Sequence, residues 1–73
     1  DFLNKAFEIN KYDAEIVYNL IEVNLLEKNY TVSSSYLDYY YKHHDKLQTF
    51  GNSIEYYDSK IVLFKNYLSN LSE

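Results

Sequence analysis

Six apolar residues in the last third of the chain are spaced 3, 4, 3, 4 and 3 residues apart: Ile54, Tyr57, Ile61, Phe64, Leu68 and Leu71. This spacing keeps one apolar stripe on one side of an α-helix, and it excludes a β-strand, whose faces alternate every second residue. A second, shorter stripe of Tyr56, Leu63 and Tyr67 lies about 100° further round the same helix. One stripe is enough to dock a helix on a small core. The second indicates that this helix contacts either another neighbour within the chain or a binding partner.

The composition favours long helices in a single small domain. The 73 residues include no proline, no cysteine and one glycine, so few residues break a helix and neither disulfides nor thiolate zinc sites can form. With 47% hydrophobic and 19% aromatic residues, the chain is too apolar for a disordered tail. We therefore expect one all-α domain over residues 1–73. The chain lacks an initiator methionine and a signal-peptide pattern, so we interpret it as excised from a larger protein.

Charge and motifs argue against several classes of function. Eleven acids against seven basic residues give a net charge of −4, without the basic face that is typical of phosphate-binding proteins, so nucleic acid is not an expected partner. No apolar run approaches the ~20 residues of a membrane span, so we expect no direct membrane insertion. No phosphate-binding loop, metalloprotease helix or nucleophile elbow occurs in the sequence. We expect no catalytic site, no metal and no cofactor.

The pair His43-His44, next to Asp45, is the one arrangement that resembles a metal site. Adjacent residues on a helix point about 100° apart, so the two imidazoles cannot chelate one ion without a third ligand from elsewhere. We predict one half-buried and one exposed histidine instead.

The first segment, from Asp1 to about Lys28, has helical periodicity. Its one-sided apolar residues are Leu3, Phe7, Ala14, Val17 and Ile21. A continuous helix of this length would extend about 42 Å, clearly longer than the later segments. Two alternatives stay open: the helix overhangs its partners, or it breaks near Lys11-Tyr12-Asp13.

A second helix is predicted from about Val32 to Leu47, after a tight connection at Asn29-Tyr30-Thr31 whose Asn or Thr caps it. On one side it carries Ser33, Tyr36, Leu37, Tyr40, His44 and Leu47. The run Ser33-Ser34-Ser35 reads either as a linker or as small helical residues that let a neighbouring backbone approach. The periodic residues after the run favour the helix.

A third helix is predicted after the turn at Phe50-Gly51-Asn52-Ser53. Gly51 is expected to end the preceding helix in the left-handed conformation, and Asn52 with Glu55 resembles a capping box. Short turns make sequential helices antiparallel neighbours. The predicted fold is an up-down-up antiparallel three-helix bundle with helix pairing like that of tetratricopeptide repeats (TPR).

The order of tyrosines and small residues after Asn29 follows a known pattern. The residues that carry it are Tyr30, Ser33-Ser34, Tyr36, Tyr39-Tyr40 and the segment Phe64-Lys65-Asn66-Tyr67-Leu68. From Asn29 to Glu73 the chain resembles the MIT (microtubule-interacting and transport) domain, as found at the N-terminus of the AAA ATPase that disassembles ESCRT-III polymers. It departs from the family at Asn70-Leu71-Ser72, where the family has Arg-Ala-Glu, and in helix 1, which needs an insertion before Tyr30.

The resemblance implies a groove between helices 2 and 3 that binds amphipathic helical tails of ESCRT-III-like proteins. The family's groove leucine falls on Leu68, and the other implied partner-binding residues are Leu37, Tyr40, His44, Ile61 and Lys65. A small footprint of this kind gives roughly micromolar affinity. The implied parent protein is cytoplasmic and is recruited to endosomal membranes for protein transport, and the isolated domain is expected to be a monomeric adaptor.

Two other interpretations stay open. MIT domains and tetratricopeptide repeats share an antiparallel helix pair, so the chain also fits a fragment of a helical repeat array whose next repeat covers the second stripe. A small acidic viral or bacterial inhibitor would need its acids on one face. The acids are instead scattered along the sequence: Asp13, Glu15, Glu22, Glu27, Asp38, Asp45, Glu55 and Asp58.

Overall fold

The computed structural model describes residues 2–71, which form four α-helices and a short 3₁₀ turn. In chain order these are α1 (Phe2–Ile9), α2 (Ala14–Leu26), α3 (Tyr30–Lys42), the 3₁₀ turn η1 (His44–Lys46) and α4 (Ile54–Leu71). The all-α prediction is confirmed for this part of the chain, with four helices where three were predicted. Asp1, Ser72 and Glu73, which the predicted domain and the MIT resemblance include, lie outside the described residues.

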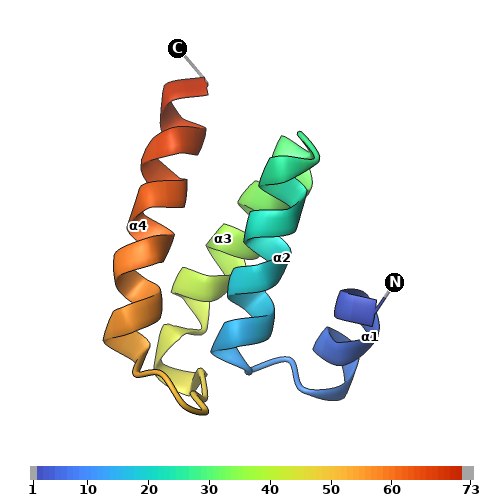
Figure 1. Cartoon of the computed structure of the whole chain (residues 1–73), viewed down its shortest axis with the longest axis vertical. Coiled ribbons are helices and arrows are strands. Elements are labelled where there is room, and N and C mark those ends of the chain that lie inside the picture. The colour runs from blue at the N-terminus through green and yellow to red at the C-terminus, as the bar shows by residue number, and fades with distance from the viewer. Residues whose placement is uncertain (1, 72–73) are drawn as a thin grey trace.

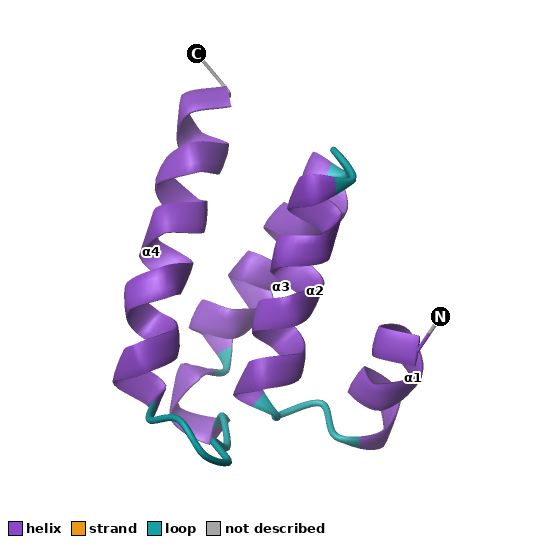
Figure 2. Cartoon of the chain, in the orientation of Figure 1, coloured by secondary structure: helices purple, strands orange, loops and turns teal. Residues whose placement is uncertain are grey.

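The three longer helices lie side by side and alternate in direction. In Figure 1, α2 rises, α3 descends and α4 rises, while the short α1 lies on the side of α2 away from α4. α2 packs against each of the other three helices, and α4 contacts both α2 and α3. Figure 2 shows the loops that join them, and the C-terminal end of α4 extends past the turn between α2 and α3. No helix in residues 2–71 combines the length and the apolar character needed to cross a bilayer.

The first predicted segment is broken, which decides between the two alternatives left open for it. Four residues separate α1 from α2. Within them, Asn10 Oδ1 accepts a hydrogen bond from the Tyr12 amide at 3.2 Å. Asp13 Oδ1 then accepts from the amides of Glu15 and Ile16 at 3.0 and 3.4 Å. Asp13 is therefore the N-cap of α2, because its carboxylate satisfies amides that lack a partner within the helix.

α2 and α3 form a helical hairpin closed by three residues. Lys28 has a φ of 64°, the left-handed conformation that ends many helices, and the Asn29 amide donates to the Asn24 carbonyl at 2.8 Å. Asn29 occupies the N-cap position of α3, but its side chain makes no capping hydrogen bond, and Thr31 lies inside the helix. The predicted cap of α3 by one of these side chains is therefore wrong.

α3 ends earlier than predicted, at Lys42 instead of about Leu47. The chain then tightens into η1 and returns to the linker between α1 and α2. There the Gln48 amide donates to the Tyr12 carbonyl at 2.6 Å, and the Gln48 carbonyl accepts from the Ala14 amide at 2.9 Å. These backbone hydrogen bonds compete with helix continuation and hold the loop beside the start of α2.

Ser53 caps α4, in place of the predicted Asn52. Its Oγ accepts a hydrogen bond from the Tyr56 amide at 3.3 Å, so the predicted capping box of Asn52 and Glu55 is wrong. Gly51 has a φ of 101°, a conformation that L side chains rarely adopt. It lies in the loop before α4 and does not end α3, so its predicted conformation is confirmed but its predicted place is not.

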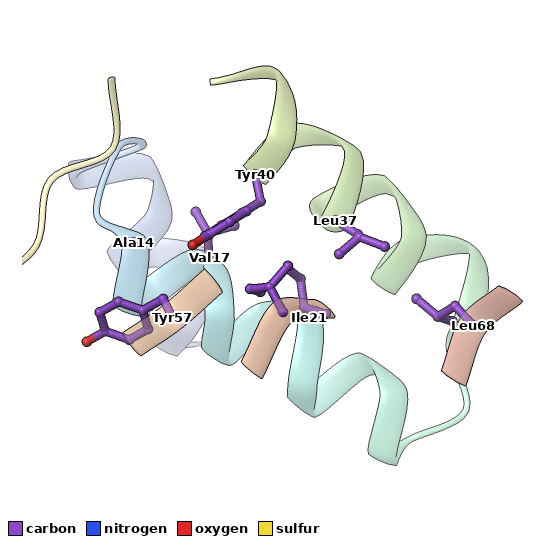
Figure 3. Close-up of a cluster of buried hydrophobic side chains, with 8 residues drawn as sticks. Ala14, Val17, Ile21, Leu37, Tyr40, Tyr57 and Leu68 are labelled. Atoms are coloured by element: carbon purple, nitrogen blue, oxygen red, sulfur yellow. The ribbon is translucent and has the colours of Figure 1, made fainter. Parts of the chain in front are cut away.

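The core lies between α2, α3 and α4. Its main cluster of buried apolar residues is Ala14, Val17, Ile21, Leu37, Tyr40, Tyr57, Ile61 and Leu68. Leu37 and Leu68 lie at one end of this cluster, and Ala14 and Tyr57 lie at the other (Figure 3). All eight belong to the predicted stripes, whereas Leu20, which is also buried, does not.

The second stripe of α4 is largely exposed. The exposed fractions are 43% for Tyr56, 64% for Leu63 and 50% for Tyr67. Within the described chain, α4 therefore packs on the core with its first stripe, and most of the second stripe stays open.

Candidate functional site

The six side chains predicted to bind a partner divide between the interior and the surface. Four are core residues with at most 8% exposure: Leu37, Tyr40, Ile61 and Leu68. The other two, His44 and Lys65, are exposed. A partner cannot touch Tyr40 or Ile61 in the folded chain, because their exposed fraction is 0%. For these two residues, burial contradicts the predicted direct contact with a partner, because both belong to the core.

Tyr40 and His44 meet at Asp58 of α4, an acid for which the sequence predicted no role. The Tyr40 hydroxyl donates to Asp58 Oδ1 at 2.6 Å, and His44 Nε2 lies 2.9 Å from the same oxygen. Burial, and then the hydrogen bond to Asp58, raises the pKa of Tyr40, so this phenol remains a donor. Nearby, Lys65 Nζ lies 5.3 Å from the centroid of the Tyr41 ring. The contacts of Asp58 tie α3 and η1 to the first half of α4, and the contact of Lys65 ties α3 to its second half.

A hollow of about 460 Å³ opens between α3 and α4, where α3 begins and α4 ends. It is lined by Tyr30, Thr31, Ser34, Ser35, Asp38, Leu68 and Leu71. The two leucines supply apolar surface, the hydroxyl residues supply small polar walls, and Asp38 supplies a negative charge. With 45% of its surface exposed, Leu71 is open to a partner, whereas Leu68 is only 8% exposed.

The serine run shapes this side of α3. Ser33 is fully buried, and its Oγ donates to the Ile21 carbonyl at 2.8 Å, which holds α3 close to α2. This close approach is the role predicted for small helical residues. Ser34 and Ser35 line the hollow, and the Ser35 Oγ donates back to the Thr31 carbonyl at 3.0 Å. Short side chains therefore leave space between the helices that longer ones would fill.

A second hollow, of about 370 Å³, lies between α2 and α4. Its lining is mainly apolar: Glu22, Leu25, Leu26, Phe64 and Tyr67. Next to it, the Tyr18 ring stacks on Phe64 with centroids 5.5 Å apart, and its hydroxyl donates to Glu22 Oε2 at 3.3 Å. Burial, and then the neighbouring Glu22, raises the pKa of Tyr18. Glu22 is therefore the charged group in an otherwise apolar lining.

The two histidines differ as predicted. His43 is half-buried and contacts the rings of Tyr12 and Tyr39, with centroids 5.7 and 4.4 Å away, whereas His44 is exposed. Within residues 2–71, no group of three His, Asp or Glu side chains is arranged to hold a metal ion.

Sequence reasoning missed most of the lining of the hollow between α3 and α4. The missed residues are Tyr30, Thr31, Ser34, Ser35, Asp38 and Leu71. One signal was available for Leu71: it ends the first stripe of an 18-residue helix that faces a 13-residue α3, so the last turn of the stripe has little helix opposite it. Comparison with known proteins does not supply a relative for this site, since no protein family, no curated protein and no solved structure matches the chain.

Proposed function

We propose that this chain is a protein-interaction module that binds an amphipathic helix of a partner in the hollow between α3 and α4. The observation that carries the proposal is the lining of this hollow, in which Leu68 and Leu71 lie beside Ser34 and Ser35. Leucines bury the apolar anchors of a docked helix, and small residues let its backbone approach closely. Tyr40 and Ile61, which are buried in the core further along the same two helices, help to hold α3 and α4 at their separation.

Charge selects the kind of helix that fits. Asp38 lies in the lining of the hollow, and the chain carries a net charge of −4. A partner helix with basic residues beside its apolar stripe gains electrostatic attraction at this edge. The small area of the hollow favours weak, reversible binding, roughly micromolar.

The resemblance to MIT domains supports a narrower form of the proposal. In this form α2, α3 and α4 act as an up-down-up three-helix bundle, and the occupant is the basic helical tail of an ESCRT-III-like protein. The module then tethers its cytoplasmic parent protein to endosomal membranes during sorting. Support comes from Leu68, the residue aligned with the family's groove leucine, which lines the hollow. His44 and Lys65 lie too far along the helices to line it and would contact only the end of a long tail.

The test compares two variants of α4, each of which replaces one exposed leucine by aspartate. The probe is a synthetic amphipathic peptide with leucines at helical spacing and flanking lysines. We expect Leu71→Asp to weaken binding of this peptide by at least about tenfold, because a carboxylate replaces the accessible apolar contact. Leu63→Asp is the matched control, since Leu63 is exposed and lies outside the hollow. Fluorescence anisotropy of the labelled peptide measures both variants, and equal loss in both, or no binding to the unmodified chain, would refute the proposal.

Leu68→Asp is a poor choice for this experiment. Leu68 belongs to the buried cluster and is 8% exposed, so a carboxylate there would lose its hydration inside the core. Loss of binding in that variant would report unfolding as readily as a lost contact.

A second candidate function is a segment of a helical repeat array. The observation that favours it is that the α2–α3 hairpin has a helix on each side. Phe7 of α1 packs edge-on against Tyr36 and Tyr39 of α3, and α4 contacts both α2 and α3. Stacked hairpins in repeat proteins contact their neighbours in this manner. In that case α1 and α4 belong to the preceding and following repeats, and the second stripe of α4 is a stacking surface.

A further inference from the structure

One face of α4, on the side of α2, carries four residues at spacings of 4, 3 and 4: Tyr56, Lys60, Leu63 and Tyr67. The two tyrosines and Leu63 are between 43% and 64% exposed. Lys60 lies on the same face, since its Nζ is 5.1 Å from the centroid of the Tyr56 ring. From α2, Leu26 adds a side chain that is 76% exposed. We call these five residues the outer face.

The outer face borders the hollow between α2 and α4, because Leu26 and Tyr67 belong to both. The hollow adds the rings and methyl groups of Phe64 and Leu25, and it adds the carboxylate of Glu22. One positive group, Lys60, and one negative group, Glu22, therefore lie on the same apolar surface. A surface that carries both charges can complement itself.

We propose that the outer face binds a second copy of this chain, with the two α4 helices antiparallel about a two-fold axis. The spacing of 4, 3 and 4 is the same in both directions along the helix. In an antiparallel pair of α4 helices, one register therefore places each of the four positions opposite one of the four positions of the second copy. In that register Tyr56 lies opposite Tyr67 of the second copy, and Lys60 lies opposite Leu63 of the second copy. Such an interface is isologous and closes at two subunits.

The same register brings the opposite charges together. Glu22 lines one hollow with Phe64 and Tyr67, one turn along α4 from Leu63. Lys60 of the second copy, opposite Leu63, therefore comes within reach of Glu22, and the symmetry axis forms this pair twice. Tyr56 of the second copy lies against Tyr67, beside the apolar hollow, and the ring of Tyr56 packs into this hollow.

The area is that of a weak dimer. From their exposed fractions, the apolar residues of the outer face present about 400–500 Å² per copy, with aromatic side chains of about 150–250 Å² each. Two copies would bury about 800–1,000 Å², near the lower bound of specific interfaces, so we expect a dissociation constant of roughly 100 µM. The sequence alone predicted a monomer. Under this proposal the chain is a monomer at low concentration and a dimer at high concentration.

Sedimentation equilibrium of the 73-residue chain, from about 10 µM to about 1 mM, tests the interface. The expected result is a reversible equilibrium between monomer and dimer. Leu63→Asp should leave a monomer throughout this range, with unchanged far-ultraviolet circular dichroism. Val62→Asp is the control, because Val62 is 44% exposed and lies off the outer face, and it should dimerise like the unmodified chain.

A charge exchange tests the register. Lys60→Glu and Glu22→Lys should each weaken the dimer about tenfold, since each puts like charges together twice in the interface. The double variant should recover to within about threefold of the unmodified chain. Lys65→Glu, the same change of charge on an exposed residue off the outer face, should have no effect. Three results would each overturn the proposal. The unmodified chain could stay monomeric, or the double variant could fail to recover dimerisation. The chain could also associate without limit, as the repeat array predicts.

Discussion

Two buried tyrosines differ in how their hydroxyl groups are satisfied. Tyr40 is fully buried, and its hydroxyl donates to Asp58 at 2.6 Å. Tyr57 is 2% exposed, and its buried hydroxyl has no hydrogen-bond partner among the described residues. A buried polar group without a partner costs about 1–3 kcal/mol, so the two rings contribute alike to packing but differently through their oxygens.

The pair Tyr40→Phe and Tyr57→Phe measures this difference. We expect Tyr40→Phe to lower the free energy of unfolding by about 1 kcal/mol, because Asp58 loses a donor, and Tyr57→Phe to leave it unchanged or to raise it by up to about 1 kcal/mol. Urea unfolding followed by circular dichroism gives both values, and each variant is the control for the other. The opposite order of stabilities would contradict the hydrogen bonding described for these two hydroxyls.

Periodicity predicted the buried residues well, because burial repeats with the helix. The core positions of Tyr40, Ile61 and Leu68 follow from that repeat. It could not predict which polar atom meets a buried hydroxyl, since Asp58 and Tyr40 are 18 residues apart and meet only through the packing of α3 on α4. The resemblance to MIT domains implied that Tyr40 and Ile61 contact a partner, whereas both are fully buried in the core.

At the scale of the elements, the break between α1 and α2 was hard to locate for a geometric reason. The linker contains four residues, close to one helical turn, so the apolar repeat from Phe7 to Ala14 continues in phase across it. The break depends on local hydrogen bonds of Asn10 and Asp13 that compete with the helix. A periodic pattern contains no information about such bonds.

The N-cap of α2 gives an element-scale prediction. Asp13→Ala should lower the free energy of unfolding by about 1 kcal/mol, because the amides of Glu15 and Ile16 lose their acceptor at the positive end of the helix. Asp45→Ala, which removes the same charge from an exposed position in η1, is the matched control and should change stability by less than about 0.5 kcal/mol. Chemical denaturation measures both, and equal losses would show that the cap does not stabilise α2.

At the scale of the whole molecule, the all-helical class was predicted better than the surfaces between the helices. Short connections already required antiparallel neighbours, and α2, α3 and α4 alternate in direction (Figure 1). The hollow between α3 and α4 depends on unequal helix lengths and on which serine of a run of three faces inward. The sequence alone left the role of the second stripe of α4 open, because a stripe on a helix does not say whether the chain itself covers it.

The many tyrosines in and around the core make the stability of the whole molecule sensitive to high pH. Burial is the largest cause that raises the pKa of five of them above the ordinary value of 10.0: Tyr18, Tyr30, Tyr39, Tyr40 and Tyr41. Above pH 10 the unfolded chain releases protons that the folded chain retains, so the free energy of unfolding falls as the pH rises, whereas below pH 10 these groups have no effect. The fully buried Tyr40 alone lowers the free energy of unfolding by about 1.4 kcal/mol for each pH unit above pH 10.

We therefore expect an alkaline unfolding transition above pH 10 in which tyrosine ionisation and loss of helix coincide. Absorbance at the tyrosinate band should rise in two stages. In the first stage the exposed tyrosines ionise and circular dichroism is unchanged. In the second stage the buried tyrosines ionise and the helical signal is lost. Tyr40→Phe should move the second stage to a different pH, because it removes the group with the largest increase in pKa, while Tyr36→Phe, whose ring lies at the edge of the core, should not. Ionisation of all ten tyrosines in one step near pH 10 with the helices intact would mean that the rings are not held in the core as described.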